Sequence, residues 1–340
     1  MCTTEVRVTS LISLQAIYAA RSAIAGTALR TPLVFAPTLS ARTSRDIRLK
    51  LETTQPTGAF KIRGAANALA RLGGKDRERG VICASTGNHG RAVAQAAARL
   101  RVRATVCMSN LVPENKVAAI RALGAEVRIG GSSQDEAQAE VDRLVAAEGW
   151  TAIPPFDHPD IIAGQGTIGL ELLEDFAELD TVIVPLSGGG LIAGIASAIK
   201  PAAPAVRVIG VSMDQGAAMD VSLKAGRPVN VAEEPTLADS LGGGIGLNNR
   251  WTLEIVRELV DEVVLVSEAR IADSMRALFF EEGWVAEGAG AIGLALLNQP
   301  YLASLGRRVA IIVSGRNVDM ARFQEVIAGA PATEERRCRG

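Results

Sequence analysis

Short β-branched runs alternate with amphipathic stretches along most of the chain. In the first half, the runs cover residues 81–84, 104–107 and 126–129, and the amphipathic stretches cover residues 88–100, 113–123 and 133–147. The runs show no regular polar face, which is typical of strands in a parallel sheet covered by helices on both sides. We therefore expect strands at the runs and helices at the amphipathic stretches.

The same alternation returns in the second half of the chain. Strands are predicted at residues 181–184, 206–211, 263–266 and 309–313, with a helix at residues 191–199. The order predicts an α/β fold of two doubly wound lobes, each a mostly parallel sheet flanked by helices. We expect a large domain of residues 1–74 and 150–330, a small mobile domain of residues 75–149, and a disordered polar tail of residues 331–340.

Composition and charge limit the classes of partner. The chain has 340 residues, of which 48% are hydrophobic and 21% charged, and its formal net charge is −1. Such a charge gives no overall field that would attract nucleic acid or an anionic membrane. The sequence shows no apolar run long enough to cross a bilayer and no leader-like start, so we expect a cytoplasmic protein without membrane partners.

The cysteine and histidine content argues against a disulfide frame and against a metal-dependent hydrolase. The four cysteines show no paired spacing, so we interpret them as reduced thiols. Two histidines, His89 and His158, leave few candidates for a histidine-rich metal site or a Ser-His-Asp relay.

The first candidate for chemistry is Lys61, which follows a glycine-containing turn in residues 56–64 and opens a predicted helix. The positive end of the helix dipole and a partly apolar setting both disfavour an ammonium group there. A neutral, nucleophilic amine is therefore more available at Lys61, as a covalent bond to a carbonyl compound requires. The alternative is an ordinary surface lysine in the first turn of a helix.

Two further segments join a strand to a helix through small and hydroxylated residues. Residues 85–90 and 187–191 each bring backbone N–H groups to a helix N-terminus, where a carboxylate or a phosphate binds well. The three glycines of residues 188–190 also allow a ligand to approach the backbone closely. The alternatives are simple capping by Ser85 or Asn88 in the first segment and a plain glycine turn in the second.

A fourth segment, residues 313–319, follows the last predicted strand. Ser314 stands at the carboxyl end of that strand, where its hydroxyl group can face a ligand in the crevice of the sheet. Capping of a following helix is the alternative role for this serine.

The order and separation of these four segments resemble the fold-type II pyridoxal-phosphate (PLP) enzymes: threonine dehydratases, serine racemases and 3-hydroxyaspartate ammonia-lyases. The resemblance extends from about Ile17 to about Asp319 and includes residues 30–33 and 162–167. Residues 185–190 and 238–247 make the chain most similar to the hydroxyectoine-utilisation dehydratases. The resemblance implies a fold like that of the tryptophan synthase β-subunit, with PLP bound in the large domain.

The resemblance implies a role for the residues that would face the cofactor ring. Lys61 matches the lysine that carries PLP as a Schiff base and moves protons at the substrate Cα and Cβ atoms. Phe60 matches the residue packed on the ring, and Asn88 matches the amide bonded to the ring hydroxyl. Ser314 matches the partner of the pyridine nitrogen, and Glu287 matches an acidic residue near the cofactor.

The resemblance also implies where the phosphate of PLP binds. Gly188, Gly189 and Gly190 match the phosphate loop of the family. Ser187 stands where many members have a fourth glycine, and Leu191 completes the segment.

Three residues, Ser85, Thr86 and His89, match positions around the substrate. Racemases place a second serine, their base on the opposite face of the ring, where this chain has Thr86. The threonine methyl group crowds the ring, so racemase activity is not favoured. Gly243 and Gly244 replace hydroxylated residues of serine racemases, which leaves room for a substrate bulkier than serine.

Metal-activated members place carboxylate ligands and a carbonyl where this chain has Ser212, Gly216 and Ala218. A hard cation prefers carboxylate oxygens, so we expect no activating metal.

The sequence thus predicts a PLP-dependent dehydratase or ammonia-lyase that removes the β-hydroxyl of an amino acid, in hydroxyectoine degradation. The alternatives within the family are a threonine/serine or 3-hydroxyaspartate ammonia-lyase, a serine-type racemase, and a synthase that performs β-replacement. The alternative of another class is a non-catalytic nucleotide- or effector-binding α/β protein, which would leave Lys61 and Ser314 without a task. The family resemblance also implies a homodimer.

Overall fold

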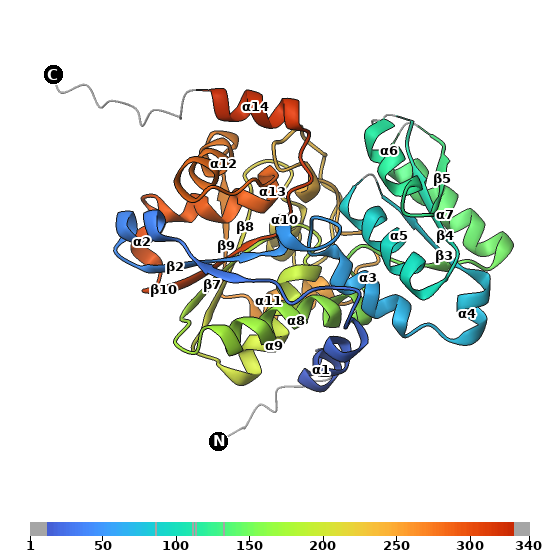
Figure 1. The fold of residues 1–340 in the computed structure, drawn as a ribbon, viewed down its shortest axis with the longest axis horizontal. Coiled ribbons are helices and arrows are strands. Elements are labelled where there is room, and N and C mark those ends of the chain that lie inside the picture. The colour runs from blue at the N-terminus through green and yellow to red at the C-terminus, as the bar shows by residue number, and fades with distance from the viewer. Residues whose placement is uncertain (1–11, 86, 111, 113, 132, 330–340) are drawn as a thin grey trace.

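Two sheets divide the chain into two lobes, which lie side by side in Figure 1. The structure is a computed structural model that describes residues 12–85, 87–110, 112, 114–131 and 133–329. The predicted α/β class is confirmed, since every strand pair is parallel except the pair of β1 and β2. No helix in these ranges is both long and apolar enough to cross a membrane.

The large lobe contains a six-stranded sheet in the order β1-β2-β10-β7-β8-β9. The strands of this sheet are β1 (Leu33–Phe35), β2 (Asp46–Leu51), β7 (Thr181–Pro185), β8 (Arg207–Met213), β9 (Glu262–Val266) and β10 (Arg308–Val313). The central strands β7 and β10 are buried on both faces because alternate residues enter different apolar clusters: Ile311 packs on one side, and Ala310 and Ile312 on the other.

Helices cover both faces of the large sheet. One face is covered by α2 (Pro37–Thr43), α12 (Glu268–Glu282), α13 (Gly288–Ala291), η3 (Ile292–Leu297) and α14 (Met320–Ala328). The other is covered by α8 (Pro159–Asp175), α9 (Gly190–Ala202) and α11 (Thr252–Leu259), and α1 (Leu14–Ala23) packs against α8 and α9. The remaining short elements are η1 (Glu52–Thr54), α10 (Ala218–Ala225), η2 (Asp239–Leu241) and η4 (Tyr301–Ser304).

The small lobe contains a four-stranded parallel sheet in the order β5-β4-β3-β6. Its strands are β3 (Val81–Ala84), β4 (Ala104–Met108), β5 (Glu126–Ile129) and β6 (Thr151–Ala152). One face packs against α5 (Asn88–Leu100) and α6 (Glu114–Arg121), and the other against α7 (Gln134–Glu148), while α4 (Gly74–Arg79) precedes β3. This sheet therefore reaches Ala152, three residues beyond the expected end of the small domain at residue 149.

Helix α3 (Lys61–Ala70) connects the lobes, because it packs on both of them. Its apolar residues Ile62, Ala65 and Leu69 join the cluster of α5 in the small lobe. On the opposite side it meets α8 at glycines: a Cβ atom on Gly164 would lie 2.6 Å from Arg63 O. Helix α3, whose first residue is Lys61, therefore lies where the two lobes meet (Figure 1).

Most of the predicted helices and strands are confirmed with small changes at their ends. Helix α5 has the predicted bounds, whereas α6 ends at Arg121, before the left-handed turn of Gly124 at φ +84°. The predicted tail of residues 331–340 lies outside the described residues.

Candidate active site

Three segments that are distant in the sequence meet around the amine of Lys61. The backbone N–H of Phe60 donates to Ser314 O at 3.0 Å, which fastens the turn before α3 to the end of β10. Lys61 Nζ donates to Pro155 O at 2.8 Å. The next residue, Phe156, packs on the glycine loop of residues 187–190. The structure thus gathers the predicted lysine, the predicted serine and the predicted phosphate loop in one place.

Burial lowers the pKa of Lys61 to about 8, although the negative charge of Glu287 acts in the opposite direction. The cause is desolvation, which penalises the ammonium form more than the neutral amine. A lysine with this pKa holds a useful fraction of neutral amine near physiological pH, when an ordinary lysine would be almost fully charged. The amine is therefore suited to attack a carbonyl carbon and to accept a proton.

A chain of amide and carboxylate groups lies beside Lys61. Asn88 Nδ2 donates to Glu287 Oε1 at 2.8 Å, and Asn88 Oδ1 accepts from Asn317 Nδ2 at 2.6 Å. Asn317 Nδ2 also donates to Thr57 O at 2.8 Å, and Asn317 Oδ1 accepts from Arg91 Nη1 at 3.1 Å. These contacts fix which side of the Asn88 amide carries its N–H groups, and Asn88 therefore does not cap α5.

No role was predicted for Asn317 from the sequence, although this residue lies in the fourth segment.

Ser314 is buried at the end of β10, and its hydroxyl group lies 3.5 Å from Ala289 O. The following helix, α14, is capped instead by Asp319, whose carboxylate accepts from two backbone N–H groups of the first turn. The alternative role of Ser314 as a helix cap is therefore wrong. Its long contact with Ala289 O is the one hydrogen bond found for this hydroxyl group among the described residues.

The glycine loop lies between β7 and α9, with Ser187 half-buried and Gly188, Gly189 and Gly190 buried. Gly189 has φ +86° and precedes the first turn of α9 without any side-chain cap, so the N–H groups of that turn are left for another acceptor. The side chain of Leu191 packs in the apolar core of the large lobe. Leu191 can therefore offer a ligand its backbone N–H group but not its side chain.

Ser85 and His89, two of the residues predicted around the substrate, both bond to the backbone of the protein. Ser85 Oγ accepts from the backbone N–H groups of Gly87 and Gly90, at 3.2 and 2.9 Å, so Ser85 stabilises the start of α5. His89 points inward, and its Nε2 atom lies 2.8 Å from Ile153 O. Burial lowers the pKa of His89 to about 3, so the ring is neutral and donates its Nε2 proton to that carbonyl. Thr86 lies outside the described residues.

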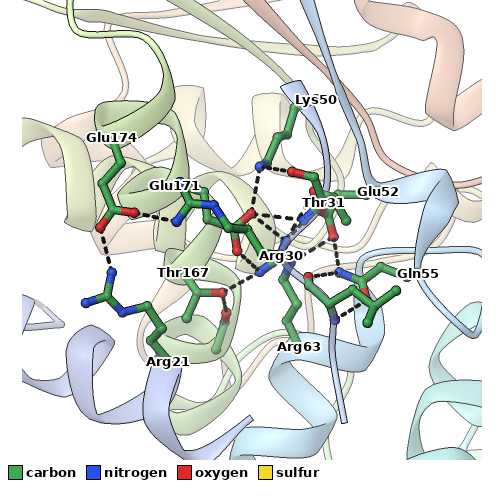
Figure 2. A network of polar contacts seen from close by, with 12 residues as sticks. Arg21, Arg30, Thr31, Lys50, Glu52, Gln55, Arg63, Thr167, Glu171 and Glu174 are labelled. Carbon is green, nitrogen blue, oxygen red and sulfur yellow. Dashed lines mark hydrogen bonds and ion pairs between the residues drawn. The ribbon is translucent and has the colours of Figure 1, made fainter. Parts of the chain in front are cut away.

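A buried ion-pair network around Arg63, shown in Figure 2, is a further feature that the sequence did not reveal. Arg63 pairs with Glu52 at 2.7 Å and with Glu171 at 2.6 Å, and Lys50 also pairs with Glu171 at 2.6 Å. Arg63, Lys50 and Glu52 are at most 1% exposed. The network joins α3, β2, η1 and α8, and it therefore fixes the helix that begins with Lys61.

The grouped residues fit a cofactor that carries an aldehyde, an aromatic ring and a phosphate. Lys61 offers an amine of lowered pKa for the aldehyde, and Ser314 offers a neutral hydroxyl group for a ring atom. The uncapped start of α9 and the side-chain-free glycine loop offer backbone N–H groups for a phosphate. The turn before α3 is bonded to the end of β10 through Phe60 N–H and Ser314 O, and the residue after Pro155 packs on the glycine loop.

Comparisons with known proteins agree with this fit. A family description, "Pyridoxal-phosphate dependent enzyme", matches residues 24–315. A Sinorhizobium fredii protein, provisionally named as a threonine dehydratase, is 54% identical over 96% of this chain and 98% of its own length. The L-threonine ammonia-lyase of Thermotoga maritima is 42% identical over 93% of this chain and 78% of its own length. The structure of maize serine racemase, 33% identical, superposes with a TM-score of 0.88 over 94% of this chain and 98% of that chain.

Proposed function

The chain belongs to the pyridoxal-phosphate dependent enzymes and is a lyase of the threonine dehydratase and ammonia-lyase type, and on that premise we propose that it eliminates the β-hydroxyl of a hydroxylated amino acid. The products are a keto acid and ammonia. The observation that carries this proposal is the Lys61 amine. It lies near the glycine loop and Ser314, and burial lowers its pKa to about 8. The non-catalytic alternative is set aside because the relatives are enzymes.

Bound PLP supplies an electron sink conjugated to the substrate amine. Lys61, in its neutral form, accepts the proton from the substrate Cα atom, and its lowered pKa keeps that form populated at the working pH. The pair of Asn88 and Glu287, joined at 2.8 Å, would orient the ring of bound PLP. The backbone N–H groups of the glycine loop would hold its phosphate.

Ser314 makes elimination the favoured outcome. A hydroxyl group at the ring nitrogen can exchange a hydrogen bond, but it carries no charge that would hold the nitrogen protonated. A neutral partner of this kind would make the bound ring a weaker electron sink, which would favour prompt loss of a β-leaving group. Transamination is disfavoured for the same reason, and replacing Ser314 with Asp should raise its share of the product.

The substrate we propose is a hydroxylated amino acid formed during hydroxyectoine degradation. Support comes from residues 185–190 and 238–247, which resemble the hydroxyectoine-utilisation dehydratases, and from Gly243 and Gly244, which leave room for a long side chain. Threonine is the second candidate, because relatives from Thermotoga maritima and Escherichia coli are named for it. We also propose a cytoplasmic homodimer, by resemblance to the family.

A substrate panel tests the proposal. Purified protein with PLP is offered L-threonine, L-serine, 3-hydroxyaspartate and a longer β-hydroxylated amino acid, and keto acid and ammonia are quantified. We expect equal amounts of both products from one of these compounds, without any added nucleophile. Ammonia release that depends on an added thiol or amine would indicate β-replacement, and inversion of the substrate without keto acid would indicate a racemase.

A further inference from the structure

Five residues between β6 and α8, Ile153–Asp157, contact both Lys61 and the glycine loop; we call them the strap. Two of its carbonyl groups accept hydrogen bonds from site residues. Ile153 O accepts from His89 Nε2 at 2.8 Å, and Pro155 O accepts from Lys61 Nζ at 2.8 Å. The strap therefore fastens α5 of the small lobe and the first residue of α3 to the same piece of backbone.

The next residue of the strap, Phe156, lies directly against the glycine loop. A Cβ atom on Gly188 would lie 2.4 Å from Phe156 Cδ1, and a Cβ atom on Gly190 would lie 2.9 Å from Phe156 Cβ. Real Cβ contacts are never this short, so any side chain at either glycine would displace the aromatic residue. The position of the loop backbone is thus set on one side by Phe156.

The start of α11 sets the position of the loop on the other side. A Cβ atom on Gly189 would lie 3.0 Å from Thr252 Cβ and 2.7 Å from Met219 Cε. Thr252 is the first residue of α11 and is fully buried. The glycine loop is therefore enclosed between Phe156 and Thr252.

Asp157 joins these two sides. Its carboxylate accepts three backbone N–H groups: from Arg250 at 2.7 Å, from Trp251 at 2.9 Å and from Thr252 at 2.8 Å. Hydrogen bonds to a carboxylate are about twice as strong as those between neutral groups. One side chain thus holds the strap, and with it Phe156, to the start of α11.

We propose that Asp157 is a positioning residue for the cofactor phosphate: its carboxylate closes a clamp of Phe156 and Thr252 around the glycine loop. The clamp fixes the loop N–H groups in the arrangement that a phosphate needs, and the same strap sets Pro155 O against Lys61. Asp157 acts through these neighbours and does not touch the phosphate itself. The proposal rests on the assignment of the glycine loop as the phosphate site, which belongs to the proposed function.

The test compares Asp157→Asn with Asp180→Asn. Asp180 precedes β7 at the end of the strand opposite the glycine loop, and its carboxylate likewise accepts two backbone N–H groups, at 2.8 and 2.9 Å. Full-length protein is stripped of PLP and titrated with PLP and with pyridoxal, which lacks the phosphate; the thermal midpoint is recorded for each variant.

We expect Asp157→Asn to raise the dissociation constant of PLP about tenfold, the effect of one hydrogen bond to a charged group, and that of pyridoxal by about twofold or less. Asp180→Asn should lower the thermal midpoint but leave PLP affinity within about twofold of the wild type. An unchanged PLP affinity in Asp157→Asn would overturn the proposal, as would equal losses for PLP and pyridoxal or an equal loss in Asp180→Asn.

If Asp157→Asn does not fold, Phe156→Leu gives the same comparison, since it removes the ring against the glycines and leaves the carboxylate in place. Selective loss of PLP affinity supports the clamp, and unchanged affinity contradicts it. The proposed function fails separately, when the wild-type protein binds no PLP or releases no keto acid.

Discussion

Lys61 and Arg63 lie two residues apart in the first turn of α3, yet their surroundings change their basicity in opposite directions. Burial lowers the pKa of Lys61 to about 8, against the pull of Glu287. Burial acts on Arg63 in the same sense, but hydrogen bonds and charge from Glu52 and Glu171 outweigh it and raise the pKa of the guanidinium group. Burial alone does not decide whether a cation stays charged; the partners within hydrogen-bond distance do.

The two settings serve different tasks on one helix. Around Arg63, two cations and two carboxylates balance one another, and each finds partners inside the protein, as Figure 2 shows. Lys61 instead donates to a neutral carbonyl group, so its proton is held weakly. A firmly fixed helix thus presents a loosely held proton, which is what a nucleophile and general base requires.

The largest effect is expected from removing the amine. Lys61→Ala should lower the turnover number by about a hundredfold to ten thousandfold, because a general base contributes that much, and it should leave the fold intact. Steady-state kinetics and circular dichroism measure the two effects. Lys200→Ala, which removes a lysine paired with Asp261 in the last turn of α9, at the end away from the glycine loop, is the matched control. A turnover number of Lys61→Ala within tenfold of that of the control would contradict the role of Lys61 as general base.

The second effect is on stability, from the other member of the pair. Arg63→Met should lower the free energy of unfolding by about 3–5 kcal/mol, because buried Glu52 would lose its ion-pair partner and Glu171 would keep only Lys50. Urea denaturation measures the loss. Arg71→Met, at the exposed end of the same helix, breaks a surface pair with Asp160 and should cost less than about 1 kcal/mol. Similar losses in both variants would show that the buried network is not special.

The third effect concerns His89, a neutral neighbour of Lys61. Its pKa is about 3 in the folded state, below its ordinary 6.5, so the unfolded chain binds the extra proton between these values. The contribution of neutral His89 to the free energy of unfolding is therefore fully present above pH 6.5. It falls as the pH drops, by about 2 kcal/mol at pH 5. His89→Gln keeps a donor for Ile153 O and should flatten this dependence in urea titrations at several pH values. An unchanged slope would contradict the buried, neutral state of His89.

The smallest effect sharpens the account of Lys61 itself. Glu287 raises the pKa of Lys61, so Glu287→Gln should move it further down. The pH dependence of acylation of Lys61 in PLP-free protein, followed by peptide mass spectrometry, measures this pKa. A shift to higher pH in the variant would show that the carboxylate does not act on the amine.

Sequence patterns predicted what is encoded locally. Helix α5 was predicted with its observed bounds because an apolar stripe begins directly after a glycine turn. The glycine loop was found because it lies between a buried strand and a helix. The local argument for Lys61 was weak, since a lysine in a first turn is common, and the family resemblance supplied its role.

The missed features depend on contacts between distant parts of the chain. Arg63 meets Glu171, which is 108 residues away, and Lys61 meets the carbonyl group of Pro155, 94 residues away. Asn317 likewise meets Asn88 across 229 residues. A backbone carbonyl has no signature in the sequence, and a buried arginine looks like any other until its carboxylates are in place. Local patterns therefore predicted where the site lies but not how its charges are balanced.

The central claim is that PLP is bound covalently at Lys61, and labelling measures this most directly. The PLP-loaded protein is reduced with borohydride and digested, and the modified peptide is identified by mass spectrometry. Of the six lysines in the chain, Lys61 should carry the label, and Lys61→Ala should carry none. A label on Lys50, Lys200 or any other lysine in the wild-type protein would contradict the account.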